Sequence, residues 1–153
     1  MATLKERLDA ELKDAMRAKD ELKTGVLRMV KSAVKYKEVE PGAQALDDAG
    51  VIQVMMTLVK QRRDSAEQFA QGGRADLAEK ENKEIAVIQS FLPQQLSAAE
   101  LSDAVKKAIG EAKASGPKDM GAVMKILSGP LKGKAEGKAI SEEVKNQLAK
   151  LGS

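Results

Sequence analysis

The chain contains neither cysteine nor histidine, and the absence of both removes several kinds of chemistry at once. Without cysteine there is no thiolate nucleophile and no disulfide, and without histidine there is no imidazole base. The usual zinc sites, which combine these two residue types, are excluded as well. We therefore expect no cofactor, no bound metal and no catalytic activity of the isolated protein.

Aromatic residues and long hydrophobic runs are also scarce. Two Phe and one Tyr are the aromatic residues of the 153-residue chain, so Leu, Ile, Val, Met and Ala must build the core. No apolar run reaches the roughly 18 residues of a membrane-spanning helix. The opening residues 1–14 have no hydrophobic signal segment and are too acidic for a typical transit peptide. These observations predict a cytoplasmic protein without a membrane partner.

The excess positive charge is concentrated in the C-terminal part of the chain. Residues 1–92 hold 16 basic and 16 acidic side chains, whereas residues 93–153 hold 10 Lys against 7 acidic side chains. The net charge of +3 therefore belongs to the second part alone. This asymmetry favours an anionic partner, although a lysine-rich surface is also typical of a merely solvated face.

Apolar residues recur three and four positions apart almost throughout, and no alternating strand pattern is present, so the predicted fold is all-α. Three helices begin at side chains that can cap a helix N terminus, namely Thr3, Asp20 and Asp47 or Asp48. Gly72-Gly73 ends the third helix because glycine adopts the left-handed conformation at little cost. A fourth helix is predicted over about 75–91.

Pro93 separates two predicted subdomains. The residue before a proline is disfavoured in the α conformation, so the fourth helix is expected to end at Leu92. The prediction is an N-terminal four-helix subdomain over 1–92 and a smaller, basic three-helix subdomain over 93–153.

Three further signals place the helices of the second subdomain. Ser97 and Glu100 have the spacing of a capping box. A short helix is predicted over about 119–127, after the break at Gly116-Pro117, and Ser141 is expected to cap the last helix.

The segment 60–93 surrounds a thin apolar stripe with charges of both signs. Arg62 falls on the apolar side, so we expect it to be partly buried and paired with Glu81 or Glu84. This favours a salt-bridged helical hairpin; the alternative is a site for an anion or a partner, formed by Arg62, Arg63 and Arg74. Neighbouring Lys and Arg lower carboxylate pKa values, so acid–base catalysis by the acidic residues is not expected.

The segment 118–138 is the main candidate for binding an anion. Lys118 and Lys125 lie two helical turns apart and flank a shallow surface at Gly121. A glycine inside a helix costs about 1 kcal/mol relative to alanine, so Gly121 suggests close approach of a neighbouring helix or of a nucleic-acid backbone. Further lysines project from a flexible, glycine-spaced stretch. The candidate nucleic-acid-binding residues are Lys118, Gly121, Lys125, Lys132, Lys134 and Lys138.

Three motifs together resemble the GatB/YqeY family: residues 60–93, GPKDMGAVMKIL at 116–127 and LKGKAEGKAI at 131–140. In that family a small helical domain occurs alone or as the tail of the B subunit of the tRNA-dependent amidotransferase. The resemblance implies a module that contacts tRNA, associated by family with carbon–nitrogen ligase activity that uses glutamine. The amidase and phosphorylating sites of that enzyme lie in other domains or subunits.

One residue departs from the family pattern. Family members often show Gly-Arg/Lys-Ala-Asp-Gly, whereas this chain has Glu136 at the fourth position. Glutamate makes the local turn hydrogen bonds of aspartate poorly, so we expect the loop to be set differently.

The sequence therefore predicts a non-catalytic, monomeric accessory domain that binds tRNA or another structured RNA. With few aromatic residues, it would recognise the RNA backbone and shape rather than stack on bases. The alternative is a helical protein-interaction module, with no nucleic-acid role, whose partner contacts the N-terminal helices.

Overall fold

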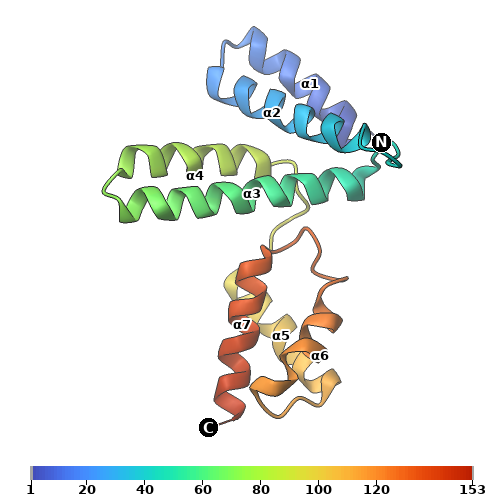
Figure 1. Cartoon of the computed structure of the whole chain (residues 1–153), viewed down its shortest axis with the longest axis vertical. Helices are drawn as coiled ribbons and strands as arrows, with labels where there is room; N and C mark the ends of the chain where they lie inside the picture. The colour runs from blue at the N-terminus through green and yellow to red at the C-terminus, as the bar shows by residue number, and fades with distance from the viewer. Residues whose placement is uncertain (1, 153) are drawn as a thin grey trace. The chain divides into compact units, whose positions relative to one another are not determined.

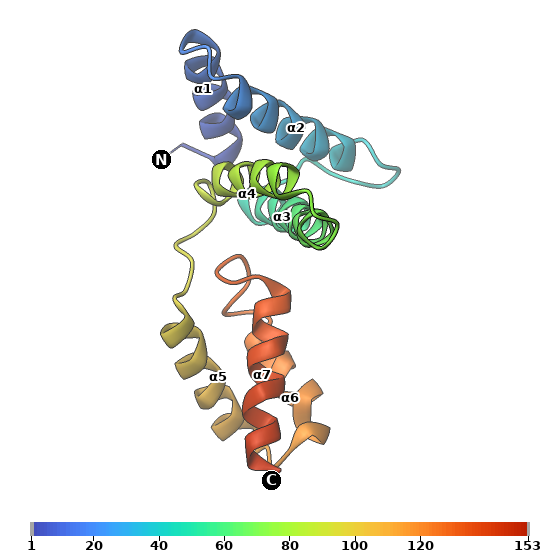
Figure 2. The ribbon, with the colours of Figure 1, turned by 90° about the vertical axis from the view of Figure 1, so that its left-hand side faces the viewer.

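The computed structural model describes residues 2–152, and all regular structure in this range is helical (Figures 1 and 2). The order along the chain is α1 (Leu4–Arg17), α2 (Glu21–Glu38), α3 (Asp48–Gln71), α4 (Ala75–Gln89), α5 (Ala98–Ala112), the 3-10 turn η1 (Pro117–Asp119), α6 (Met120–Leu127) and α7 (Gly137–Leu151). The chain divides into two compact units, Met1–Leu92 and Pro93–Ser153. The prediction of an all-α fold, with four helices followed by a smaller helical group, is confirmed.

Side-chain caps explain where four of the helices begin. Thr3, Asp20, Asp47 and Ser97 each accept a hydrogen bond from the backbone N–H three residues later, at 2.9–3.1 Å. At Ser97 the capping box is complete, because the Glu100 carboxylate accepts in return from the Ser97 N–H at 3.0 Å. The bond from the Ser97 N–H is the main cause that holds the pKa of Glu100 below its ordinary value. Each cap satisfies an amide that the helix itself leaves without a partner.

Left-handed residues end α1 and α3 in the same way. Gly73 follows α3 with φ +78°, and the next amide, of Arg74, donates to the Phe69 carbonyl at 2.7 Å. Lys19 takes this conformation after α1 with φ +57°, and the amide that follows it donates to the Ala15 carbonyl at 3.0 Å. Both arrangements are Schellman motifs, which glycine adopts without strain and lysine does not.

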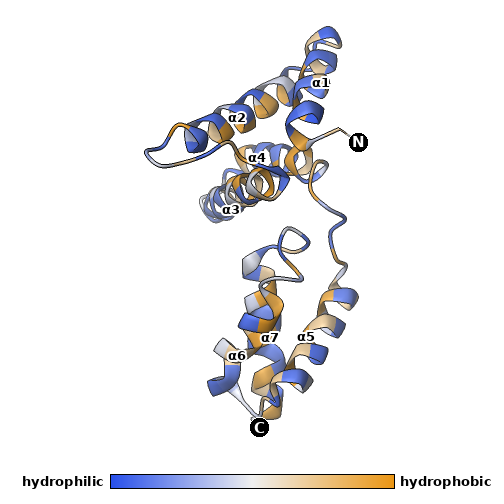
Figure 3. Ribbon diagram, turned by 90° about the vertical axis from the view of Figure 1, so that its right-hand side faces the viewer, coloured by the Kyte–Doolittle hydropathy of each residue, from blue (hydrophilic) through white to orange (hydrophobic). Residues whose placement is uncertain are grey.

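Two antiparallel helix pairs, α1 with α2 and α3 with α4, make up the N-terminal unit (Figure 1). Their apolar faces meet in one core, whose least exposed side chains include Leu27, Met55 and Ile88. The hydrophobic stretches of these helices are visible in Figure 3. Within residues 2–152, no helix is sufficiently long and apolar to cross a lipid bilayer.

Helices α5, α6 and α7 form the C-terminal unit around a second apolar core. Val105, Val123 and Leu148, one from each helix, are almost completely buried in it. Leu131 joins the same core from the segment between α6 and α7. This burial fixes the path of that segment along the unit.

Two helix starts in the C-terminal unit differ from the prediction. Helix α7 begins at Gly137, not at Ser141, whose hydroxyl instead donates to the Lys138 carbonyl at 3.1 Å. The earlier start places Ile140 in the core, and this tertiary packing outweighs the low helix propensity of Gly137. The short helix α6 begins at Met120, with the residues just before it in the 3-10 turn η1.

Candidate functional site

The five candidate lysines and Gly121 are all exposed in the C-terminal unit. They come from four successive parts of the chain. Lys118 lies in η1, Gly121 and Lys125 in α6, Lys132 and Lys134 in the segment 128–136, and Lys138 in the first turn of α7. We call this set of six residues the lysine strip.

The lysine strip is elongated, because its first and last members lie near opposite ends of α7. Gly152, just after α7, packs so closely on Pro117 that a Cβ at this glycine would lie 3.2 Å from the proline Cδ. Lys118 therefore lies near the C-terminal end of α7, whereas Lys138 belongs to its first turn. A helix of this length rises by roughly 20 Å. Helix α6 and the segment after it run back along α7 over this distance (Figure 2).

The middle of the strip is held by two residues that precede α5. The Gln95 side chain donates to the Gly133 carbonyl at 2.7 Å, and the Leu96 N–H donates to the Lys134 carbonyl at 2.9 Å. Gly133 is buried and has φ +77°, a conformation that suits glycine. The expectation of a flexible stretch is therefore wrong here: Lys132 and Lys134 extend from an anchored backbone.

Gly121 leaves an open surface on α6. A Cβ built at this position would meet no atom within 4 Å outside its own helix backbone. The expected close approach of a neighbouring helix is therefore not the reason for this glycine within the described chain.

One carboxylate beside the strip is held in its charged form. The Asp119 carboxylate accepts hydrogen bonds from the Ser115 N–H at 2.7 Å and the Ser115 hydroxyl at 3.3 Å. The bond from the Ser115 amide is the main cause that keeps the pKa of Asp119 below its ordinary value. The negative charge of Asp119 therefore offsets part of the positive charge at Lys118. The positive potential of the strip comes mainly from its other four lysines.

Two arginines of the charged segment 60–93, Arg62 and Arg74, are engaged in ion pairs. Arg62 Nε lies 3.2 Å from Glu84 Oε2, and a guanidinium NH2 group donates to the Leu58 carbonyl at 3.1 Å. Arg74 pairs with Asp76 at 3.2 Å on the surface, and this pair lowers the pKa of Asp76. For these residues the salt-bridged interpretation of α3 and α4 is confirmed, and the anion site built on Arg62 is not.

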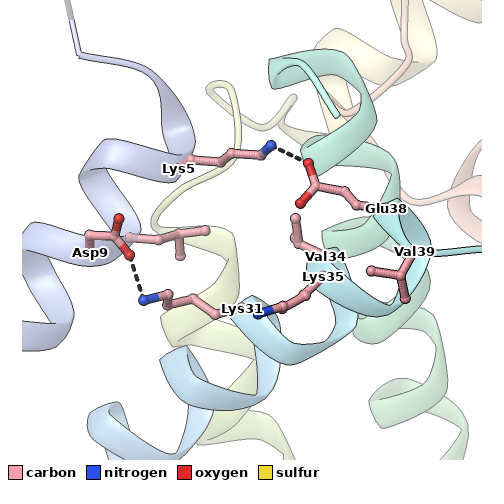
Figure 4. A pocket seen from close by; sticks show the side chains of 8 residues that line it. Lys5, Asp9, Lys31, Val34, Lys35, Glu38 and Val39 are labelled. Atoms are coloured by element: carbon pink, nitrogen blue, oxygen red, sulfur yellow. Dashed lines mark hydrogen bonds and ion pairs between the residues drawn. The ribbon is translucent and has the colours of Figure 1, made fainter. Parts of the chain in front are cut away.

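A groove that the sequence analysis missed lies between α1 and α2, with a volume of about 380 Å³. Figure 4 shows an ion pair across each end of it, Lys5 with Glu38 and Lys31 with Asp9. The Lys31–Asp9 pair has an N–O distance of 2.5 Å. The apolar lining includes the buried Leu8. The lining residues follow Lys5 by three and four positions on α1, and follow Lys31 by three, four, seven and eight on and just after α2, but nothing in the sequence indicates that the two faces meet.

The Lys5–Glu38 pair also shapes the electrostatics of this groove. The hydrogen bond from Lys5 is the main cause that lowers the pKa of Glu38, and a second bond, from the Leu46 N–H at 2.7 Å, acts in the same direction. Glu38 thus ties α1, α2 and the chain before α3 together. Among residues 2–152, no group of three or more acidic, His or Cys residues is placed to hold a metal ion.

Comparison with known proteins identifies relatives. The model of a family described as Yqey-like protein matches residues 5–148. The chain is similar to the protein named "Altered inheritance of mitochondria protein 41, mitochondrial" in several yeasts. Identity is 37% over 112 residues with Lachancea thermotolerans, covering 72% of this chain and 60% of the relative. It is 33% over 125 residues with Saccharomyces cerevisiae strain S288c, covering 76% and 68%.

These relatives correct the expected cellular location, and their greater length limits which of their properties can be assigned to this chain. The expected cytoplasmic location is wrong, because the relatives are named as mitochondrial proteins. Targeting signals are recognised by receptors and are separate from the folded domain, so the sequence of a helical domain does not indicate its cellular location. The match spans about three fifths of the Lachancea relative's length, so activities of that whole protein do not carry over directly.

Proposed function

The chain belongs to the Yqey-like protein family, and from this premise we propose that it is a non-catalytic accessory domain that binds tRNA or another structured RNA. The observation that carries the proposal is the lysine strip, with five exposed lysines along roughly 20 Å of surface. The excess charge of the whole chain lies in this unit. Such a surface suits a phosphate backbone.

The strip would hold RNA by position and charge. Each lysine is a compact positive charge that pairs with a phosphate without reading a base. Gly121 lacks a side chain between two of these lysines, which gives a sugar–phosphate chain room to approach the helix. None of the strip residues is aromatic, so this surface would recognise backbone and shape. A role beside a tRNA-dependent amidotransferase belongs to the same proposal and rests on the resemblance of residues 60–93, 116–127 and 131–140.

Filter binding of tRNA across a salt series tests the proposal. Each neutralised phosphate contributes roughly 0.7–0.9 to the slope of log affinity against log salt. Four contacts imply about a hundredfold loss of affinity between 50 and 200 mM salt, by the same relation. The double change Lys118→Ala and Lys125→Ala should flatten the slope by about 1.5–2 and leave the helical content unchanged.

A matched control removes the same charge elsewhere in the unit. Lys106 and Lys107 are exposed on α5, outside the strip, and changing both to Ala should alter the slope much less. The rival function, a helical protein-interaction module, predicts no tRNA binding even at 50 mM salt. That result, or equal effects of the two double variants, would reject the proposed function.

A further inference from the structure

The chain has a single tyrosine and no tryptophan, and this tyrosine is exposed. Tyr36 lies near the end of α2 with 72% of its surface accessible, whereas Phe91 is buried in the core. Aromatic side chains that remain on a surface are typical of binding sites, because they offer a large rigid face and a polar tip. Tyr36 is therefore a feature that the lysine strip does not explain.

Tyr36 lines a groove of about 360 Å³ between α2 and α3, which we call the α2–α3 groove. Its apolar lining consists of Ala33, Val54 and Leu58, and the last two are buried at the edge of the core. A hollow of this size is within the range of small-ligand sites. Three of its eight lining residues are apolar and the other five carry polar groups, a mixture that suits an aromatic ring with polar edges.

The α3 side of the groove carries a row of neutral polar side chains. Gln53, Thr57 and Gln61 follow one another at intervals of four, so they lie on one face of α3, and all three are exposed. The Thr57 hydroxyl donates to the Gln53 carbonyl at 3.1 Å and keeps acceptor capacity. Two amides and a hydroxyl in a row provide both donors and acceptors for the edge of a polar ring.

A lysine supplies positive charge beside the tyrosine. Lys37 lines the same groove, and its ammonium group lies 3.6 Å from Glu40 in a pair whose members are both largely exposed. Exposed pairs of this kind are weak, so Lys37 can exchange Glu40 for another anion at little cost. Lys35, on the other side of Tyr36 in the sequence, is exposed as well.

We propose that the α2–α3 groove binds an unpaired nucleotide of the RNA. The base would stack on Tyr36, its edge would hydrogen-bond to the Gln53–Thr57–Gln61 row, and its phosphate would pair with Lys37. An aromatic face, neutral donors and acceptors, and one cation match the three parts of a nucleotide. This inference rests on the proposed function and extends it, since the lysine strip has no aromatic residue on which a base could stack.

Tyrosine fluorescence provides a direct test, because Tyr36 is the sole tyrosine and the chain has no tryptophan. The full chain is titrated with a single-stranded RNA hexamer and, separately, with a blunt RNA duplex. Stacking should quench the emission in a saturable manner with the single strand and leave it nearly unchanged with the duplex. Emission is also followed against protein concentration without RNA.

Variants then connect the signal to the groove. Tyr36→Ala should weaken hexamer binding about tenfold or more, measured by the anisotropy of an end-labelled strand, whereas Tyr36→Phe should stay within about twofold. Gln53→Ala with Gln61→Ala should reduce discrimination among hexamers of different base. Val39→Ala, at the exposed residue that follows α2 and lies outside the groove, is the control and should leave binding unchanged.

The outcomes separate this inference from the proposed function. If the emission stays unquenched while tRNA still binds with the salt dependence expected for the lysine strip, nucleotide binding in the groove is rejected. RNA binding by the strip is then retained. Equal quenching by the duplex would overturn the preference for an unpaired base. A change in emission with protein concentration alone would assign the groove to a second copy of the chain. Absence of all RNA binding would reject both proposals together.

Discussion

Arg62 on α3 and Glu84 on α4 form an ion pair in which both side chains are largely shielded from solvent, with exposures of 13% and 19%. The guanidinium also donates to the Leu58 carbonyl and contacts the Met29 sulfur. The ion pair therefore joins α3 to α4, and its guanidinium group lies against α2 at Met29. In this setting each partner satisfies a charge that would otherwise be partly buried alone.

Removing either partner of this pair should destabilise the N-terminal unit. We expect Arg62→Ala and Glu84→Ala each to lower the free energy of unfolding by about 1–3 kcal/mol, with a coupling of at least about 0.5 kcal/mol in the double variant. The exposed Glu79–Lys83 pair, at 3.4 Å on α4, is the matched control. Its coupling free energy should be no more than about 0.5 kcal/mol. Urea denaturation measures both cycles; equal coupling in the two would contradict the structural role of Arg62.

The pH dependence of stability should include a contribution from Glu38. Its pKa is lowered from 4.5 in the folded chain, chiefly by the Lys5 hydrogen bond. A carboxyl group with a depressed folded pKa stabilises the fold above its unfolded pKa and loses that effect as pH falls through the folded value. Glu38→Gln should therefore reduce stability most near pH 6–7, and the difference from the unmodified chain should shrink below about pH 4.5.

NMR titration of the Glu38 carboxyl carbon checks the cause. Lys5→Met should raise the pKa of Glu38 toward its ordinary value, because it removes the main interaction that lowers it. An unchanged midpoint in that variant would show that the Leu46 amide alone maintains the shift.

The left-handed residues that follow α1 and α3 should respond in opposite directions to a change of residue. Lys19→Gly should raise the free energy of unfolding by up to about 1 kcal/mol, since glycine takes a positive φ without a Cβ clash. Gly73→Ala should lower it by about 1 kcal/mol or more, even though a Cβ there meets no neighbour within 4 Å. Thermal or urea unfolding of both variants measures these changes in the free energy of unfolding. A loss of stability in Lys19→Gly would argue against strain at that residue.

Gly121→Ala separates stability from RNA binding. Because the added methyl group meets open space, the variant should be more stable by about 0.5–1 kcal/mol. The same methyl group should weaken tRNA binding if a ribose–phosphate backbone approaches α6 at this position. Gly110→Ala on α5 is the control: its Cβ is equally uncrowded, so it should stabilise the unit and leave binding unchanged. Identical binding by both variants would remove Gly121 from the proposed interface.

Much of the fold follows from signals that act over three or four residues. The caps at Asp20, Asp47 and Ser97 and the glycine after α3 could be predicted because the groups that bond there are close in sequence. The start of α7 could not, because it depends on Ile140 reaching a core formed by α5 and α6. The lysines of the strip could be named from composition and spacing, but their order along α7 required the path of the intervening segment.

Local patterns in the sequence are sufficient to predict a helical chain, to locate most helix starts, and to place the excess charge after residue 92. Helix packing selected Glu84 rather than Glu81 as the partner of Arg62, 22 residues away, and placed Gln95 against Gly133 across 38 residues. It also brought Tyr36 to the same groove as Thr57. The physical reason is that apolar burial is not directional, so one amphipathic pattern is compatible with several pairings of helix faces. Which polar side chains then meet is settled only when the helices have packed.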